Sequence, residues 1–150
     1  INLNVPILIP ETYIEDSSLR LAIYRRTGNL KGKQEIEHFR SEMEDRFGSL
    51  PIEFENLLLM VKIRNFCTKL HIESIDNGPN GFVLKLTEHE KVNQMVIGFI
   101  NHHPRHAKIK PDNKLVFIKK IDQPNVINET LELLQELKKF YVTDEQHAAQ

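Results

Sequence analysis

Three histidines in the segment 102–106 form a cluster whose residue types could bind a metal ion. His102, His103 and His106 surround a turn at Pro104, and imidazole nitrogen is a ligand that zinc prefers. A usual zinc site needs three or four well-placed ligands, and no Cys or acidic residue lies close to this segment in the sequence. Because the spacing also matches no standard motif, solvated loop histidines are the favoured interpretation, and we predict no metal site.

The segment 28–34 resembles a phosphate-binding P-loop only superficially. Gly28 and Gly32 are separated by one residue too few, and Gln34 stands where that motif has the hydroxyl that binds Mg²⁺. The segment also follows a predicted helix, whereas the motif needs a preceding strand to direct its backbone N–H groups. A flexible turn between helices is the better interpretation, and we predict no nucleotide site and no cofactor in this chain.

Nucleophilic catalysis has no better support. No serine lies in a Gly-x-Ser-x-Gly elbow. Cys67 lies within a hydrophobic predicted helix, which favours a small core residue over a reactive thiol. Carboxylates are abundant, but nothing pairs two of them in an evident cleft. The sequence therefore gives no positive case for an enzyme, and catalysis ranks third among the possible functions.

Basic residues gather in two places. One group decorates the first predicted helix, at Arg20, Arg25 and Arg26. The other decorates the segment 106–120, at Lys108, Lys110, Lys114, Lys119 and Lys120. Either group could follow a phosphate backbone, although lysines beside an apolar strand also act as gatekeepers against aggregation. The net charge of −1 favours the gatekeeper role, and DNA contact through the lysines of 106–120 is kept as the alternative.

A helix predicted over about 34–47 has two contrasting faces. An apolar stripe recurs at helical spacing, formed by Ile36, Phe39, Met43 and Phe47. At about 100° per residue, Asp45 lies nearly opposite this stripe and Glu42 lies on its flank. A single charged stripe is most often a solvated helix face, and an interaction surface is the functional alternative.

The totals describe an ordinary globular domain. The chain has 150 residues, of which 40% are hydrophobic and 27% are charged, enough for a single core. With one cysteine it has no internal disulfide, and no apolar run approaches the ~20 residues that span a bilayer. We expect a cytoplasmic protein without a membrane partner. The chain begins at Ile1 rather than Met, which leads us to expect a fragment of a longer protein.

Periodicity and turn residues predict the elements that position these side chains. Residues 1–9 alternate around Pro6, as in an edge strand or an extended arm. Helices follow, then two hairpins separated by a helix that a Thr87–Glu90 capping box would open. The predicted helices are 18–27, 34–47, 51–70, 87–104 and 125–141, and the predicted strands are 72–76, 82–86, 106–110 and 114–119.

The pattern predicts an α+β fold, with N-terminal helices packed on a small antiparallel sheet and further helices between and after the strands. Three regions are expected along the chain. Residues 1–16 form an extended arm or junction, residues 17–142 form a single α+β domain, and residues 143–150 form a frayed tail.

Several segments resemble the C-terminal domain of the bacterial transcription-repair coupling factors, the Mfd family. In chain order they are Ile1-Asn2-Leu3, Leu8-Ile9-Pro10-Glu11, Arg20-Leu21 with Tyr24-Arg25-Arg26, Glu42-x-x-Asp45-Arg46-Phe47-Gly48 with Leu50-Pro51, and Pro111-Asp112 with Leu115. The block from Asp45 to Pro51 is the most specific part. Two positions depart from the family pattern: Ser49 replaces a more usual Pro, and His71 stands where a Gly commonly follows the central helix.

The resemblance implies a regulatory domain of an ATP- and Mg-dependent DNA translocase that displaces stalled RNA polymerase and recruits UvrA for excision repair. In that family this domain docks on a UvrB-like module of the same protein, covers the UvrA-binding surface and restrains the motor. The helix carrying Glu42, Asp45 and Arg46 lies at that contact. The resemblance therefore implies a non-catalytic, autoinhibitory interaction domain, with DNA contact through Lys108, Lys110, Lys119 and Lys120 as the alternative.

Overall fold

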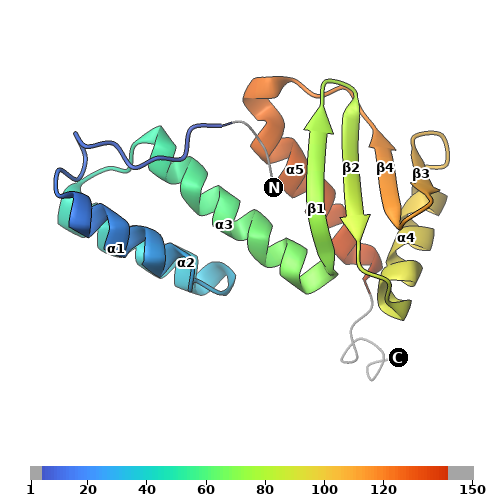
Figure 1. Ribbon diagram of the computed structural model, residues 1–150, viewed down its shortest axis with the longest axis horizontal. Coiled ribbons are helices and arrows are strands. Elements are labelled where there is room, and N and C mark those ends of the chain that lie inside the picture. The colour runs from blue at the N-terminus through green and yellow to red at the C-terminus, as the bar shows by residue number, and fades with distance from the viewer. Residues whose placement is uncertain (1–4, 142–150) are drawn as a thin grey trace. The chain divides into compact units, whose positions relative to one another are not determined.

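The computed structural model describes residues 5–141 and confirms the α+β class (Figure 1). Within this range the chain forms five α-helices, one 3-10 helix and a four-stranded antiparallel sheet. In chain order the elements are α1 (Ser17–Thr27), α2 (Gly32–Phe47), α3 (Ile52–Leu70), β1 (Ile72–Gly78), β2 (Gly81–Leu86), α4 (Glu90–His102), β3 (Ala107–Lys110), β4 (Lys114–Ile118), η1 (Gln123–Asn125) and α5 (Val126–Phe140).

The chain divides into two compact units whose boundary lies within α3. The helical unit comprises Asn4–Asn65, and the sheet unit comprises Phe66–Gln150 with Ile1–Leu3. The division into an arm at 1–16 and a domain at 17–142 stays a prediction. The predicted tail at 143–150 and the first residues of the arm lie outside the described residues.

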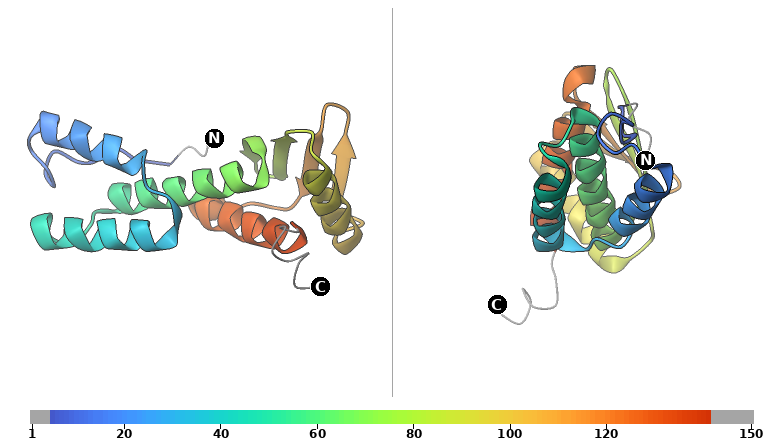
Figure 2. Two further views of the ribbon diagram at one scale, coloured as in Figure 1. Left: turned by 90° about the horizontal axis from the view of Figure 1, so that it is seen from below. Right: turned by 90° about the vertical axis from the view of Figure 1, so that its left-hand side faces the viewer.

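The helical unit is built from α1, α2 and the first part of α3, which Figure 2 shows as three helices around a common interior. The apolar stripe predicted for α2 faces that interior: Phe39 and Met43 are buried, and Phe47 packs against the same cluster. Buried residues of α3 include Phe54, Leu58 and Val61. The hydrophobic helix predicted over 51–70 therefore buries many of its apolar side chains.

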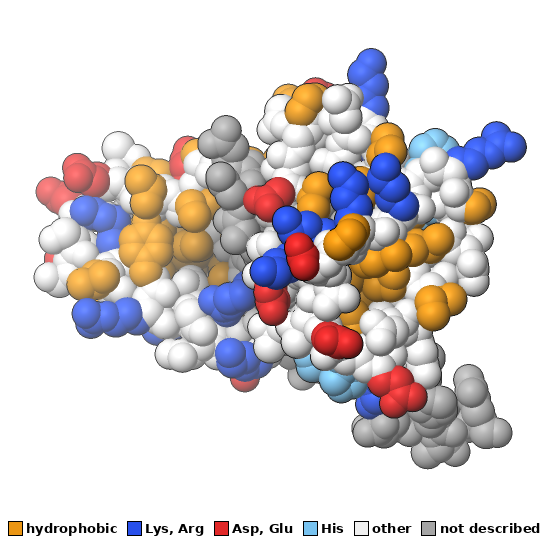
Figure 3. Space-filling view, turned by 45° about the vertical axis from the view of Figure 1, so that its right-hand side comes forward, with side chains coloured by type: hydrophobic (Ala, Val, Ile, Leu, Met, Phe, Trp, Pro, Cys, Tyr) orange, Lys and Arg blue, Asp and Glu red, His pale blue; other side chains and the backbone are white. Residues whose placement is uncertain are grey.

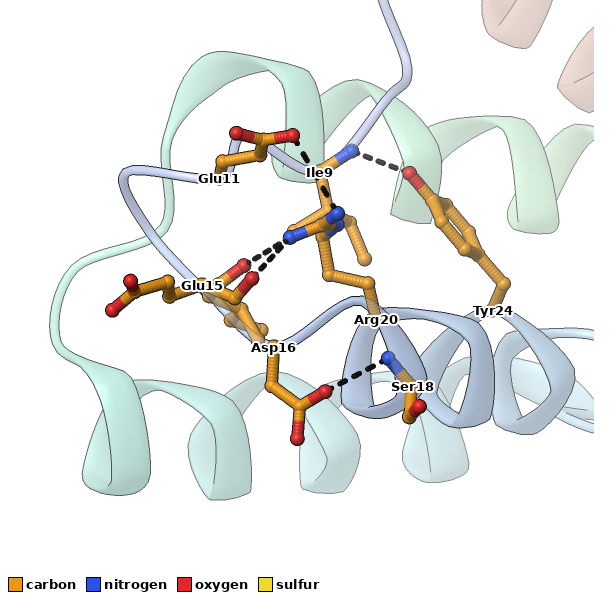
Figure 4. Close-up of polar contacts among 8 residues, drawn as sticks. Ile9, Glu11, Glu15, Asp16, Ser18, Arg20 and Tyr24 are labelled. Atoms are coloured by element: carbon orange, nitrogen blue, oxygen red, sulfur yellow. Dashed lines mark hydrogen bonds and ion pairs between the residues drawn. The ribbon is translucent and has the colours of Figure 1, made fainter.

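Residues 5–16 have no helix or strand, contain a turn at 11–13, and are held by side chains of α1 (Figure 4). The Arg20 guanidinium donates hydrogen bonds to the carbonyls of Ile14 and Glu15, each at 2.8 Å. The Tyr24 hydroxyl accepts a hydrogen bond of 2.6 Å from the N–H of Ile9. Arg20 thus satisfies backbone carbonyls of the arm, which explains structurally why it belongs to the resembling block.

Short polar contacts and turn residues set the ends of the first three helices. The Asp16 carboxylate accepts a hydrogen bond of 2.9 Å from the N–H of Ser18 and caps α1. Gly48 has a φ of 91° just after α2, a backbone angle that favours glycine. The carbonyl of Pro51 accepts the first hydrogen bonds of α3, so Pro51 stands immediately before the helix.

The capping box predicted for α4 is wrong. The helix begins at Glu90, and its N-cap is His89, whose ring Nδ1 accepts a hydrogen bond of 3.1 Å from the N–H of Lys91. Thr87 lies two residues before this cap, and its hydroxyl instead donates to Glu73 at 3.3 Å. Histidine is a rare cap, so the Thr87–Glu90 spacing placed the predicted cap two residues too early.

The sheet has the strand order β1-β2-β4-β3 and one buried face. That face carries Phe82, Leu84, Leu115 and Phe117, and the ring of Phe99 on α4 meets Phe117 edge-on at 5.1 Å. In Figures 1 and 2, α4 and α5 cover this face of the sheet. In residues 5–141 no helix combines the length and apolarity that crossing a membrane would require.

Candidate docking surface on helices α1 and α2

Glu42 joins the two helices through a paired contact with Arg26. Its two carboxylate oxygens accept hydrogen bonds from the two terminal nitrogens of the Arg26 guanidinium, at 2.8 Å for Nη2 and Oε1 and 2.5 Å for Nη1 and Oε2. This fork geometry is the strongest form of an ion pair between side chains. Glu42 is therefore neutralised by α1 rather than presented as a free negative charge.

A second guanidinium lies on the other side of the same carboxylate. Arg46, one turn further along α2, places Nη1 at 3.6 Å from Glu42 Oε2. Each arginine also lies over an aromatic ring at 4.8 Å from its centroid, Arg26 over Phe39 and Arg46 over Phe47. Ring and carboxylate together restrict both guanidinium groups, so the α1–α2 surface presents two oriented cations.

The charge of this network stabilises the ionised form of Glu42. The hydrogen bonds from Arg26, together with the positive charges of Arg26 and Arg46, lower the pKa of the Glu42 carboxyl from 4.5 to about 2. The pKa of Arg26 is raised by the same hydrogen bonds. The network therefore stays charged throughout the pH range in which proteins usually work.

Asp45 has a different environment from Glu42. Its side chain is exposed, and no hydrogen bond or ion pair joins it to any other described residue. The pair that the sequence analysis groups as one acidic face therefore splits into a carboxylate held by two arginines and a carboxylate open to solvent. Of the two, Asp45 is the one that can accept an incoming cation without breaking an existing contact.

A hollow of about 590 Å³ opens beside this network. Arg26, Leu30, His38 and Phe39 line it from α1, α2 and the loop between them. Its lining combines apolar and charged side chains, which suits a side chain of a docking partner. The α1–α2 surface (Arg26, Glu42, Asp45, Arg46 and this hollow) is the candidate docking surface.

The lysines predicted as DNA contacts fall on the open face of the sheet and beyond its last strand. Strand register aligns Lys110, Lys114 and Lys85 in one row across β3, β4 and β2, and places Lys108 beside Val116. Residues directly opposite in a sheet share a face, so these lysines project from the face opposite the core. Figure 3 shows basic side chains interspersed with hydrophobic ones on this side.

Two of the basic residues on this side are already paired. Lys119 Nζ lies 2.6 Å from Glu129 Oε2 on α5, and Lys85 Nζ lies 3.9 Å from Glu73 Oε2. Lys108, Lys110 and Lys120 are exposed and have no ion pair among residues 5–141. The described part of the open face carries Val83, Val116 and Ile118 rather than aromatic rings, so it offers cations for phosphate but no platform for base stacking.

The other chemical candidates have structural roles. Cys67 is 7% exposed, and burial raises the pKa of its thiol to about 11, which fits the predicted core residue. Residues 28–31 connect α1 to α2, whereas 32–34 already form the first turn of α2, which begins two residues earlier than predicted. Asn65 on α3 donates to the Leu30 carbonyl at 3.2 Å and ties this connection to the helical unit.

The sequence analysis missed Arg26 as part of the docking surface. It assigned Arg26 to a basic group on the first helix, because nothing in local spacing signals a contact between residues 26 and 42. One signal for this contact was present in the sequence. Tyr24-Arg25-Arg26 and Glu42-x-x-Asp45-Arg46 are both among the segments that resemble the family. Two segments of the same family pattern that carry opposite charges are candidates for a mutual contact.

Comparison with known proteins places this arrangement in a family. The TRCF domain family matches residues 3–97. The chain is 49% identical over 137 residues to a transcription-repair-coupling factor of Rickettsia conorii, covering 91% of this chain and 12% of that protein. It is 31% identical over 124 residues to the corresponding protein of Escherichia coli, covering 82% of this chain and 11% of that protein.

A solved structure shares the fold. The crystal structure of the C-terminal domain of a transcription-repair coupling factor aligns with a TM-score of 0.74 and 15% sequence identity, covering 92% of this chain and 90% of that one. The chain thus spans about an eighth of the length of the curated relatives that it matches. The resemblance inferred from the sequence is confirmed: the chain belongs to the TRCF domain family.

Proposed function

We propose that this chain is a non-catalytic docking domain of a transcription-repair coupling factor, in which the α1–α2 surface binds the UvrB-like module of the same protein. In the docked state it covers the surface through which that module binds UvrA and restrains the DNA-translocating motor. ATP and Mg²⁺ would act in the motor and not in this chain. RNA polymerase and DNA would be partners of the whole protein.

The observation that carries the proposal is the difference between Glu42 and Asp45. Glu42 fixes Arg26 and Arg46 in place, while the exposed carboxylate of Asp45 lies on the same helix without a described partner. A surface with oriented cations, one open anion and a partly apolar hollow matches the anatomy of a specific protein interface. A helix face that contacts only water does not need arginine side chains that are held in one orientation.

The proposal is tested by competition. The separated UvrB-like module is immobilised, UvrA binding is measured by surface plasmon resonance, and this chain is added at increasing concentration. We expect the chain to bind the module and to reduce UvrA binding in proportion to its occupancy. A chain that binds the module and leaves UvrA binding unchanged would refute masking, and a chain that does not bind would refute docking.

A second candidate function, contact with a DNA backbone, is favoured by the row of Lys110, Lys114 and Lys85. Like charges directly opposite in a sheet destabilise it, and only Lys85 in this row has a described carboxylate partner. A phosphate chain lying over the open face would relieve this repulsion. The exposed Lys108 and Lys120 would extend the same contact.

Fluorescence anisotropy with a labelled duplex distinguishes this second function. If the open face binds DNA, affinity is measurable at low salt and falls steeply as salt rises. Replacing Lys110 and Lys114 by Gln should then lower both the affinity and the slope of its salt dependence by about two ions. Lack of binding at low salt would remove this function and leave docking in place.

A further inference from the structure

The sheet unit brings an acidic residue to two of the histidines for which the sequence offered no third ligand. His102 ends α4, His103 follows it as the C-cap, and Glu136 lies on α5. One ligand atom from each of these three residues lies within 4.8 Å of the others. His106 does not belong to this group.

Packing fixes two of the three ligands. The His103 ring contacts both Phe99 and Phe117, with centroids at 4.7 and 5.0 Å, and its Nε2 contacts Glu136 Oε1. The side chains of His103 and Glu136 are 24% and 29% exposed, so the pair is partly shielded from water. The more mobile partner is His102, whose exposed ring meets that of His103 edge-on at 5.0 Å.

We propose that His102, His103 and Glu136 bind one divalent transition-metal ion, with zinc as the favoured ion. Two imidazole nitrogens and one carboxylate oxygen are a recurrent ligand set for zinc, and water can fill the fourth position. The two imidazole nitrogens also disfavour the hard ions Mg²⁺ and Ca²⁺, which bind through oxygen.

The separation of the ligand atoms suits this site. With bonds of about 2 Å, the ligand atoms of a tetrahedral zinc site lie about 3.3 Å apart, so the largest separation must close by about 1.5 Å. His102 can supply this movement because its side chain is exposed. A hollow of about 340 Å³ beside His102 and Glu136 gives an ion and its bound water access.

Another residue that lines the same hollow, Lys139, allows an additional test of zinc binding. An ammonium group close to a bound divalent cation opposes binding. Replacement of Lys139 by Ala should therefore strengthen zinc binding. If His103 and Glu136 form only an ion pair, this substitution has no reason to change zinc affinity.

Isothermal titration of the purified chain with zinc chloride tests the site. We expect one zinc ion per chain, with a dissociation constant in the micromolar range or tighter. His102→Ala and Glu136→Gln should each weaken binding at least about tenfold, since loss of an outer-shell partner alone costs that much. His106→Ala is the matched control and should bind as the wild type does.

Folding is checked on each variant by circular dichroism, and His102→Ala is the variant least able to disturb the core because its side chain is exposed. Zinc should also raise the melting temperature of the wild type and of His106→Ala, but not that of His102→Ala. Zinc affinity no tighter than millimolar in the wild type would overturn the proposal. Equal loss of affinity in His106→Ala and His102→Ala would overturn it as well.

Discussion

Glu42 on α2 and Arg26 on α1 form a two-pronged ion pair across the helical unit, with 2.8 Å between Nη2 and Oε1. These residues lie sixteen positions apart, and the contact makes one rigid surface from two helices. The pair gives Arg26 of the first helix and Glu42 of the second a shared structural role. It also distinguishes Glu42, which holds Arg26, from Asp45, which is exposed and has no described partner.

The first prediction concerns the pH dependence of stability. The pKa of Glu42 is about 2 in the folded chain and 4.5 without its partners, so ionised Glu42 stabilises the fold above pH 4.5. That contribution is lost as the pH falls from 4.5 towards 2. We expect Glu42→Gln to remove it, which is measured by urea unfolding at neutral pH and near pH 3.

The control for this prediction is Asp45→Asn, which removes a carboxylate without a described ion pair. Its loss of stability on acidification should match that of the wild type. The account of Glu42 is contradicted if Glu42→Gln and the wild type lose the same stability between the two pH values.

The second prediction concerns the turn between β1 and β2. Gly81 has a φ of 142°, and a Cβ there would lie 2.1 Å from the carbonyl oxygen of Phe117 on β4. Gly81→Ala should therefore lower the free energy of unfolding by at least about 2 kcal/mol. Gly78 stands on the other side of the same turn with nothing within 4 Å of an added Cβ.

Gly78→Ala is consequently the matched control and should change stability by less than about 0.5 kcal/mol. Both variants are compared by urea unfolding followed by circular dichroism. Similar losses in the two variants would contradict the close approach of β4 as the reason for a glycine at position 81.

The third prediction concerns His71, which follows α3 with a φ of 59°. Left-handed backbone costs an ordinary residue about 1–2 kcal/mol, which explains why a Gly is common here in the family. The ring of His71 stacks on that of His89 at 4.8 Å, and its Nε2 lies 3.1 Å from the Tyr141 hydroxyl. These contacts offset part of the backbone cost.

Replacing His71 by Ala removes the ring contacts and keeps the backbone cost, whereas Gly removes both. We expect His71→Gly to be more stable than His71→Ala by about 1 kcal/mol in thermal or urea unfolding. A His71→Ala variant as stable as His71→Gly would mean that the left-handed backbone carries no penalty at this position.

Features set by neighbours in the chain are the ones that sequence reasoning predicts well. The buried stripe of Phe39 and Met43 depends on local spacing, and the structure confirms it. The predicted cap of α4 is wrong because His89, a rare cap residue, takes the place that the Thr87–Glu90 spacing assigned to Thr87. Local sequence patterns do not show which of two candidate N-cap residues gives the lower free energy.

Contacts between distant residues could not be predicted in this way. Arg26 and Glu42 meet because α1 packs beside α2, and Glu136 reaches His103 because α5 passes the end of α4. Helical periodicity gives each residue a face but does not say which faces meet. The split between Glu42 and Asp45 therefore emerges only from the folded chain.

The central claim is that Asp45 is the docking carboxylate of the α1–α2 surface. Its most direct test is the affinity of this chain for the separated UvrB-like module, measured by isothermal titration for the wild type, Asp45→Lys and Glu44→Lys. The two variants make the same charge change in the last turn of α2, at exposed positions one residue apart. The account predicts that Asp45→Lys weakens binding at least about tenfold while Glu44→Lys keeps affinity close to that of the wild type. Equal affinities for Asp45→Lys and Glu44→Lys would contradict it.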